Sequence, residues 1–224
     1  MAYFQKNLKY IFESNKDLKN KYLRKLKKNF FQNKKIDIEL LYKVVKSINY
    51  SFEELFEKDL KEIEKIKHKK IKFLVTDVDG VLTDGGVYIN QNQEEGKKFD
   101  VKDGFAIRQL TQKGFQVGFL SAGFNRAIVQ KRAQMLGVQF VYVGKDPKID
   151  ILNQWCEQLK INLDQVAYIG DDFFDLEVIE RVGISACPSD AINVIKENVN
   201  FVIPRKGGKS AVRYFIDEIL SKYI

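Results

Sequence analysis

The sequence of 224 residues predicts an α/β fold: a parallel β-sheet with helices on both faces, preceded by an N-terminal helical extension. From Ile71 onward, short apolar runs alternate with segments of helical periodicity, beginning with IKFLVTD and a helix near 103–113. Strands that alternate with helices of this size are typical of parallel sheets. The runs are almost continuously apolar, which indicates that both faces of the sheet are covered. We therefore expect a Rossmann-like domain over residues 69–224.

The later elements keep the same alternation. We expect strands at QVGFLS, FVYVG, QVAYIGDD, GISAC and FVIP, and helices near 124–136, 147–160, 174–182, 191–198 and from about Ser210. One segment differs, because residues 85–101 (GGVYINQNQEEGKKFDV) combine turn residues with two short strand-like runs. They predict a small β-hairpin cap, inserted soon after the first strand.

Residues 1–68 predict a basic helical extension. Apolar side chains recur at helical spacing, as in Phe4, Leu8 and Ile11, and no glycine or proline occurs before Gly80.

The charge of the chain is concentrated in this extension. The first 70 residues contain 19 Lys and Arg against 10 Asp and Glu, whereas the rest of the chain contains 19 against 20. Such a basic segment can bind nucleic acid or an anionic membrane. Because acidic residues are interspersed among the lysines, we favour a solvated face over a small helical bundle, or an oligomerisation element. We do not expect a nucleic-acid partner.

The composition of the chain indicates its cellular compartment. The apolar runs are of strand length, too short to span a bilayer. The N-terminus MAYFQKNLKYIFES carries charges where a signal peptide needs an apolar run. The two cysteines, Cys156 and Cys187, have no metal-ligand neighbours in sequence. We expect a cytoplasmic protein with free thiols.

Polar residues follow three of the predicted strands. The first strand ends in Asp77-Val78-Asp79-Gly80, the second in Ser121, and the fourth in Gly170-Asp171-Asp172. The carboxyl ends of parallel strands meet at one edge of a sheet, where ligands bind. Several carboxylates crowded there need a cation, and an all-oxygen ligand set favours Mg²⁺.

The same residues suggest a reaction. The only histidine, His68, lies in the basic segment, so nucleophilic and acid–base work falls to carboxylates. An aspartate can attack phosphorus to form an aspartyl-phosphate. A second carboxylate two residues later can protonate the leaving alcohol and then activate water.

DVDGVLTDG (77–85), Ser121, Lys148 and GDDFFD (170–175) together resemble, in order and placement, the four motifs of the haloacid dehalogenase superfamily of phosphohydrolases. The resemblance covers about residues 71–220. It implies that Asp77 is the nucleophile and Asp79 the general acid/base.

The resemblance also implies the supporting roles. Asp77 and Asp171 would bind Mg²⁺ by side chain, and Asp79 by its backbone carbonyl. Ser121 and Lys148 would hold the phosphoryl oxygens. Asp172 and Asp175 would form acidic support around the metal.

Within the superfamily, the DGVLTDG extension, the hairpin and the tail RKGGKSAVRYFIDEIL resemble the small-cap branch that includes 3-deoxy-D-manno-octulosonate 8-phosphate phosphatase. That branch implies a homotetramer whose glycine-rich tail reaches a neighbour's site. We expect the tail to act across an oligomer interface, unable to reach the site of its own subunit. The substrate-binding residues would then be Lys102, Arg205, Gly207, Gly208 and Arg213.

The branch implies an acidic sugar phosphate as substrate, of the 3-deoxy-octulosonate 8-phosphate or nonulosonate 9-phosphate type, in lipopolysaccharide biosynthesis. The run from Ser121 to Arg126, SAGFNR, has no arginine where the branch usually places one for the sugar-acid carboxylate. Two alternatives to an acidic sugar phosphate phosphatase therefore stay open. The first is a phosphatase for another small phosphate ester. The second is a non-catalytic subunit of this fold that works by binding through its helical extension.

Overall fold

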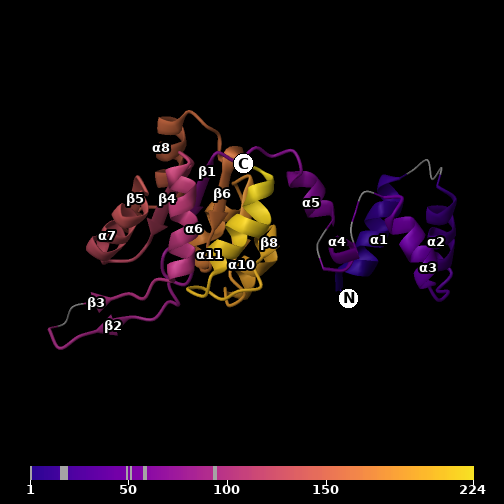
Figure 1. Ribbon diagram of the computed structural model, residues 1–224, viewed down its shortest axis with the longest axis horizontal. Helices are drawn as coiled ribbons and strands as arrows, with labels where there is room; N and C mark the ends of the chain where they lie inside the picture. The colour runs from indigo at the N-terminus through magenta and orange to yellow at the C-terminus, as the bar shows by residue number, and fades with distance from the viewer. Residues whose placement is uncertain (1, 16–19, 49, 51, 58–59, 93–94) are drawn as a thin grey trace. The chain divides into compact units, whose positions relative to one another are not determined.

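The computed structural model describes residues 2–15, 20–48, 50, 52–57, 60–92 and 95–224 (Figure 1). The chain divides into two compact units, Met1–Lys67 and His68–Ile224. Within the described residues, no helix has the length and apolarity needed to cross a membrane.

The first unit is helical. Its elements are α1 (Ala2–Ser14), α2 (Lys21–Phe31), α3 (Ile38–Val45), α4 (Phe52–Glu57) and α5 (Leu60–Ile66). The apolar stripe of α1 lies in a core of its own, in which Leu8 and Ile11 pack with leucines of α2, α3 and α4.

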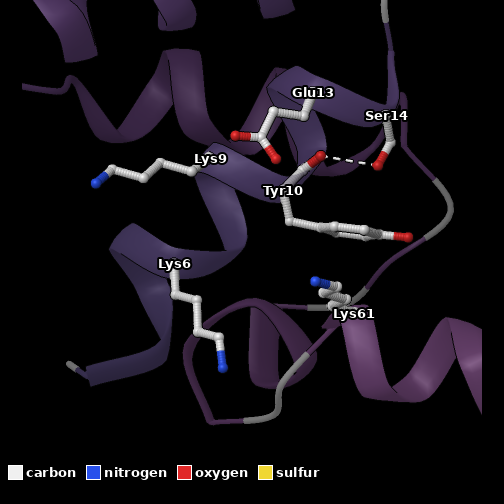
Figure 2. Close-up of a pocket in the computed structure, with 6 residues that line it drawn as sticks. All are labelled: Lys6, Lys9, Tyr10, Glu13, Ser14 and Lys61. Carbon is white, nitrogen blue, oxygen red and sulfur yellow. Dashed lines mark hydrogen bonds between the residues drawn. The ribbon is translucent and has the colours of Figure 1, made fainter.

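A hollow of about 420 Å³ lies on the surface of this unit; Figure 2 shows the residues that line it. Its walls come from α1 and α5: Lys6, Lys9, Tyr10, Glu13, Ser14 and Lys61. Lysine and glutamate side chains share the hollow, as the interspersed charges of the sequence predict.

The second unit contains a six-stranded parallel sheet in the order β5-β4-β1-β6-β7-β8. Its strands are β1 (Phe73–Thr76), β4 (Gln116–Ser121), β5 (Phe140–Val143), β6 (Val166–Ile169), β7 (Ile184–Cys187) and β8 (Phe201–Val202). The chain runs outward from β1 through β4 to β5, then returns to the other side of β1 with β6. This reversal at β1 is the topological switch point, where open α/β sheets bind ligands. The predicted α/β fold is confirmed.

Helices cover both faces of the sheet (Figure 1). On one face, Phe73 and Val75 of β1 pack among apolar residues of α8 (Lys148–Leu159), α9 (Leu176–Ile179) and α10 (Asn193–Asn198). On the other side lie α6 (Val101–Gln112), α7 (Arg126–Leu136) and α11 (Ala211–Tyr214). The helix of α11 continues as a π-helical turn, Phe215–Ile219, and a 3₁₀ turn, Leu220–Lys222. Two further 3₁₀ turns span Leu163–Gln165 and Phe173–Asp175.

The predicted hairpin is present as β2 (Tyr88–Ile89) paired antiparallel with β3 (Glu95–Gly96). It projects from the sheet unit in Figure 1. Its base is joined to the loop after β1 by an antiparallel bridge between Thr83 and Phe99. Because Thr83 is fully buried, this bridge fixes the start of the hairpin beside the carboxyl end of β1.

Candidate active site

Asp77 lies immediately beyond β1 at the switch point. Its backbone N–H donates to the carbonyl of Ile169 on β6 at 2.8 Å, so it continues the pairing of the two strands. Its side chain is buried. Ser121, also buried, ends β4 on the other side of β1, and Asp171 follows β6. The three predicted strand-end residues therefore share one edge of the sheet.

Lys148 provides the positive charge of this edge. It lies at the start of α8, where it is buried, and its Nζ donates to Asp77 Oδ1 at 2.7 Å and to Asp175 Oδ1 at 2.6 Å. Burial opposes the charge of Lys148, but attraction to Asp77 and Asp175 outweighs it, so the pKa of Lys148 is raised. The lysine remains a cation between two carboxylates.

All the oxygen acceptors of Asp175 are used inside the protein. Besides Lys148, the hydroxyl of Tyr168 donates to its Oδ1 at 2.5 Å. Its Oδ2 accepts the backbone N–H groups of Asp171 at 2.9 Å and Asp172 at 3.1 Å. Asp175 thus holds the loop after β6 and the buried ammonium group in place. Sequence reasoning missed Tyr168, whose only signal is a hydroxyl two residues before Gly170 in an apolar strand.

Asp77, Asp171 and Asp175 bring carboxylate oxygens within 4.8 Å of one another. Burial raises the pKa of Asp77 to about 7; attraction to Lys148 opposes this rise without cancelling it, and repulsion from Asp175 adds a smaller increase. Burial, followed by repulsion from Asp77 and Asp175, raises the pKa of Asp171 to about 8. The pocket therefore carries more carboxylates than Lys148 neutralises.

This cluster fits a hard cation. Asp171 Oδ1 is buried and has no hydrogen-bond partner among the described residues. Asp175 has no acceptor to spare, which leaves Asp77 and Asp171 as the side chains that would hold the ion. Their oxygen atoms are the donors that Mg²⁺ prefers. Gly80 keeps the space open, because at its φ of +88° a Cβ would lie 2.1 Å from Asp171 Oδ2.

Asp79 lies between the hairpin and the loop after β4. Lys97, directly after β3, donates from Nζ to Asp79 Oδ1 at 2.5 Å. On the other side, a Cβ added to Gly123 would lie 3.0 Å from Asp79 Oδ2 and 3.1 Å from Ser121 Oγ. Asp79 and Ser121 therefore face the same loop, and the Gly123 N–H donates to Ser121 Oγ at 3.0 Å. Lys97 was also missed by the sequence reasoning, since nothing distinguishes it from Lys98.

Asp172 lies outside the carboxylate cluster that contains Asp171 and Asp175. It is exposed, and its Oδ1 accepts the N–H of Phe173 at 2.7 Å, so it caps the 3₁₀ turn. The structure does not bring its side chain into the carboxylate cluster of the described residues.

The glycine-rich tail reaches the site of its own chain, so the expectation that it cannot is wrong. The Gly208 N–H donates to the Val81 carbonyl at 2.9 Å. A Cβ on Gly207 would lie 1.8 Å from the Gly80 carbonyl oxygen. These two glycines therefore pack directly against the loop that carries Asp79.

The predicted cationic substrate residues meet elsewhere in the sheet unit. Lys102, Arg205 and Arg213 line a cavity of about 390 Å³, and none of the catalytic candidates is among its lining residues. Within it, Arg213 pairs with Asp217 through its side chain, and its backbone N–H donates to buried Asp103 at 2.7 Å. Asp103 thus anchors the start of the last helix.

A larger cavity of about 720 Å³ adjoins Lys148. Three exposed phenylalanines, Phe124, Phe173 and Phe174, lie around it, with the Nζ of Lys145 5.5 Å from the Phe124 ring centroid. The cavity therefore lies beside Lys148, which the sequence predicts as a phosphate-binding residue.

Comparison with known proteins defines the class. Residues 93–183 match the model of the haloacid dehalogenase-like hydrolases. The chain is 36% identical over 154 residues to the 3-deoxy-D-manno-octulosonate 8-phosphate phosphatase KdsC of Escherichia coli K12, covering 69% of this chain and 81% of the relative. The chain therefore belongs to the haloacid dehalogenase-like hydrolases, and it is a phosphatase of that family.

Solved structures agree. The 3-deoxy-D-manno-octulosonate 8-phosphate phosphatase of Yersinia pestis aligns with a TM-score of 0.67 at 34% identity, over 72% of this chain and 85% of that one. The 3-deoxy-D-manno-octulosonate 8-phosphate phosphatase of Moraxella catarrhalis was solved with a magnesium ion, a phosphate ion and a KDO molecule. It aligns with a TM-score of 0.67 at 31% identity, over 72% of this chain and 91% of that one.

Proposed function

We propose that this protein hydrolyses 3-deoxy-D-manno-octulosonate 8-phosphate, or a closely related acidic sugar phosphate, with Mg²⁺ as cofactor and Asp77 as nucleophile. The observation that carries the proposal is the convergence of Asp77, Asp171 and Lys148 at the switch point of the sheet. The named relatives supply the substrate class.

In the first step, a carboxylate oxygen of Asp77 attacks phosphorus and the bond to the sugar oxygen breaks. Asp79 donates a proton to that oxygen, so the sugar leaves as a neutral alcohol. Ser121 and the ammonium of Lys148 hold phosphoryl oxygens and offset the charge that develops on them. Tyr168 and Asp175 keep Lys148 in position.

In the second step, the ionised Asp79 takes a proton from water, whose oxygen attacks the phosphorus of the aspartyl-phosphate. The acyl–phosphate bond breaks, inorganic phosphate leaves, and the Asp77 carboxylate is restored. Asp77 and Asp171 would hold the magnesium ion. When bound, the ion supplies positive charge for the phosphate and lets both carboxylates remain ionised beside each other.

The substrate assignment is tested by kinetics on a panel that contains octulosonate, nonulosonate and simple sugar phosphates with Mg²⁺. The proposal predicts the highest kcat/KM for a sugar-acid phosphate. A preference for a phosphate ester of an uncharged sugar would instead favour a phosphatase for another small ester. Such a preference would agree with the absence of the arginine that the branch usually places for the sugar-acid carboxylate. No turnover of any phosphate ester would favour a binding subunit.

We also propose that the chain forms a homo-oligomer, as the tetramers of the branch suggest, and works in the cytoplasm. The two free, buried thiols, Cys156 and Cys187, suit a reducing compartment. Sedimentation of the purified chain tests the first point and cell fractionation the second. The roles of Lys102, Arg205 and Arg213 in binding the sugar acid stay part of this proposal.

A further inference from the structure

The hairpin places a partly buried lysine, Lys97, on the carboxylate of Asp79. The Nζ of Lys97 lies 2.5 Å from Asp79 Oδ1 and 3.0 Å from Glu95 Oε1. The Lys97 side chain is only 5% exposed, although it comes from a projecting hairpin. Burying a lysine this far is unfavourable unless its charge is paired. Lys97 is thus part of the structure around Asp79, unlike the exposed Lys98 beside it.

The position of Lys97 is fixed from both directions along the chain. Glu95 and Gly96 pair with β2, and Phe99, two residues after Lys97, bridges to Thr83 in the loop that carries Asp79. Thr83 is itself held in this loop, because its Oγ1 accepts the N–H of Gly85 at 3.2 Å. The hairpin and the loop after β1 therefore hold Lys97 against Asp79.

The two oxygens of Asp79 have different surroundings. Oδ1 accepts from Lys97, whereas Oδ2 is directed toward Gly123 and Ser121, where the phosphoryl group would be held. A carboxyl group that is fixed through one oxygen presents the other in a defined direction. General acid catalysis depends on this alignment, since the proton has to reach the leaving oxygen within hydrogen-bond distance.

We propose that Lys97 is a positioning residue for the reaction: it binds one oxygen of Asp79 and thereby aims the other at the leaving-group oxygen. This inference rests on the proposed function, in which Asp79 protonates the departing alcohol. The cap hairpin then contributes directly to the chemistry. Glu95 balances the charge of Lys97, so that the lysine does not simply form a second phosphate site.

The leaving group distinguishes this role from a structural one. An alkyl phosphate needs its leaving oxygen protonated, whereas p-nitrophenolate leaves as a stable anion. We would measure kcat/KM, which reports phosphoryl transfer to Asp77 and not the later hydrolysis. For Lys97→Met, we expect a loss of roughly a hundredfold on the sugar phosphate and of less than about threefold on p-nitrophenyl phosphate. Retained activity on the aryl ester also shows that the variant is folded.

Two further variants complete the test. Lys98→Met removes an exposed lysine from the same hairpin and should leave kcat/KM unchanged for both substrates. Asp79→Asn should lose activity with the same leaving-group dependence, and adding Lys97→Met to it should cause no further loss, because both changes remove one function. Equal losses on both substrates, or additive losses in the double variant, would overturn the inference.

A wrong substrate assignment can be told apart from a wrong role for Lys97, because it shows in the activity of the wild type. If the wild type hydrolyses p-nitrophenyl phosphate but not the sugar-acid phosphate, the proposed substrate is wrong. The same comparison is then made with the alkyl phosphate of the panel that the wild type hydrolyses fastest, and the same outcomes support or overturn the role of Lys97.

Discussion

Replacing Lys148 by methionine should destabilise the protein as well as inactivate it. The methionine keeps most of the length of the side chain and removes the ammonium, which lies 2.7 Å from Asp77 and 2.6 Å from Asp175. Both carboxylates are buried, so the variant leaves two negative charges without their common partner. Breaking a buried ion pair by removing one partner costs about 3–5 kcal/mol.

We expect a cost at the lower end of that range, because protonation of Asp77 removes one of the two unpaired negative charges. Burial already raises the pKa of Asp77 to about 7, and losing Lys148 raises this pKa further. In a domain of this size, roughly 3 kcal/mol corresponds to a fall in Tm of about 6–12 °C. The deficit should shrink toward pH 5, where Asp77 is protonated, and grow toward pH 8. Bound Mg²⁺ should also reduce it by supplying a cation.

The assay is thermal unfolding followed by circular dichroism at pH 5, 7 and 8, with and without Mg²⁺. Lys145→Met, an exposed lysine three residues upstream, is the matched control and should leave Tm unchanged. A Lys148→Met variant that melts within about 2 °C of the wild type at pH 8 without Mg²⁺ would refute the electrostatic role assigned to Lys148.

Four other predictions follow from the site and the domain boundary. A chelator should abolish activity and Mg²⁺ restore it, while Ca²⁺ inhibits through its larger, looser coordination; activity that survives the chelator would contradict this. Since the pKa values of Asp77 and Asp171 are raised to about 7 and 8, calorimetry should show Mg²⁺ affinity rising from pH 6 to 8 as protons leave, whereas a flat profile would be the contrary result. Gly207→Ala puts a Cβ 1.8 Å from the Gly80 carbonyl oxygen, so the loop must shift; we expect at least about a tenfold loss of kcat/KM, and unchanged kinetics would mean that the loop adapts freely. A chain that begins at Lys69 should fold and keep phosphatase activity while changing at most its oligomeric state; an unfolded or inactive product would show that the helical extension belongs to the catalytic domain.

The sequence predicts the part of the site that follows from strand order. Asp77, Ser121 and Asp171 end strands of one parallel sheet, and the ends of such strands share an edge whatever the loops do. The position of Lys148 is predictable for a similar reason, because this lysine begins a helix that starts at the same edge of the sheet. The fold class follows from the alternation of apolar runs, which requires no knowledge of tertiary contacts.

The contacts that depend on loop paths are not predictable in this way. Asp172 and Asp175 both follow β6, and only the 3₁₀ turn decides that Asp172 caps it while Asp175 turns inward. Lys97 and Lys98 are equivalent in sequence until the hairpin buries one of them. The tail returns from β8, at the far end of the sheet, to pack on Gly80, a path that no local pattern encodes.

The proposed reaction depends on an aspartyl-phosphate at Asp77, and rapid-quench labelling detects this intermediate. The enzyme is mixed with substrate that carries radiolabelled phosphate, quenched in acid within a single turnover, and digested for peptide mapping. A covalent mechanism predicts label on the peptide that contains Asp77 in the wild type, and neither label nor turnover in Asp77→Asn. Turnover without any protein-bound label, or an Asp77→Asn variant within about tenfold of wild-type kcat, would contradict it.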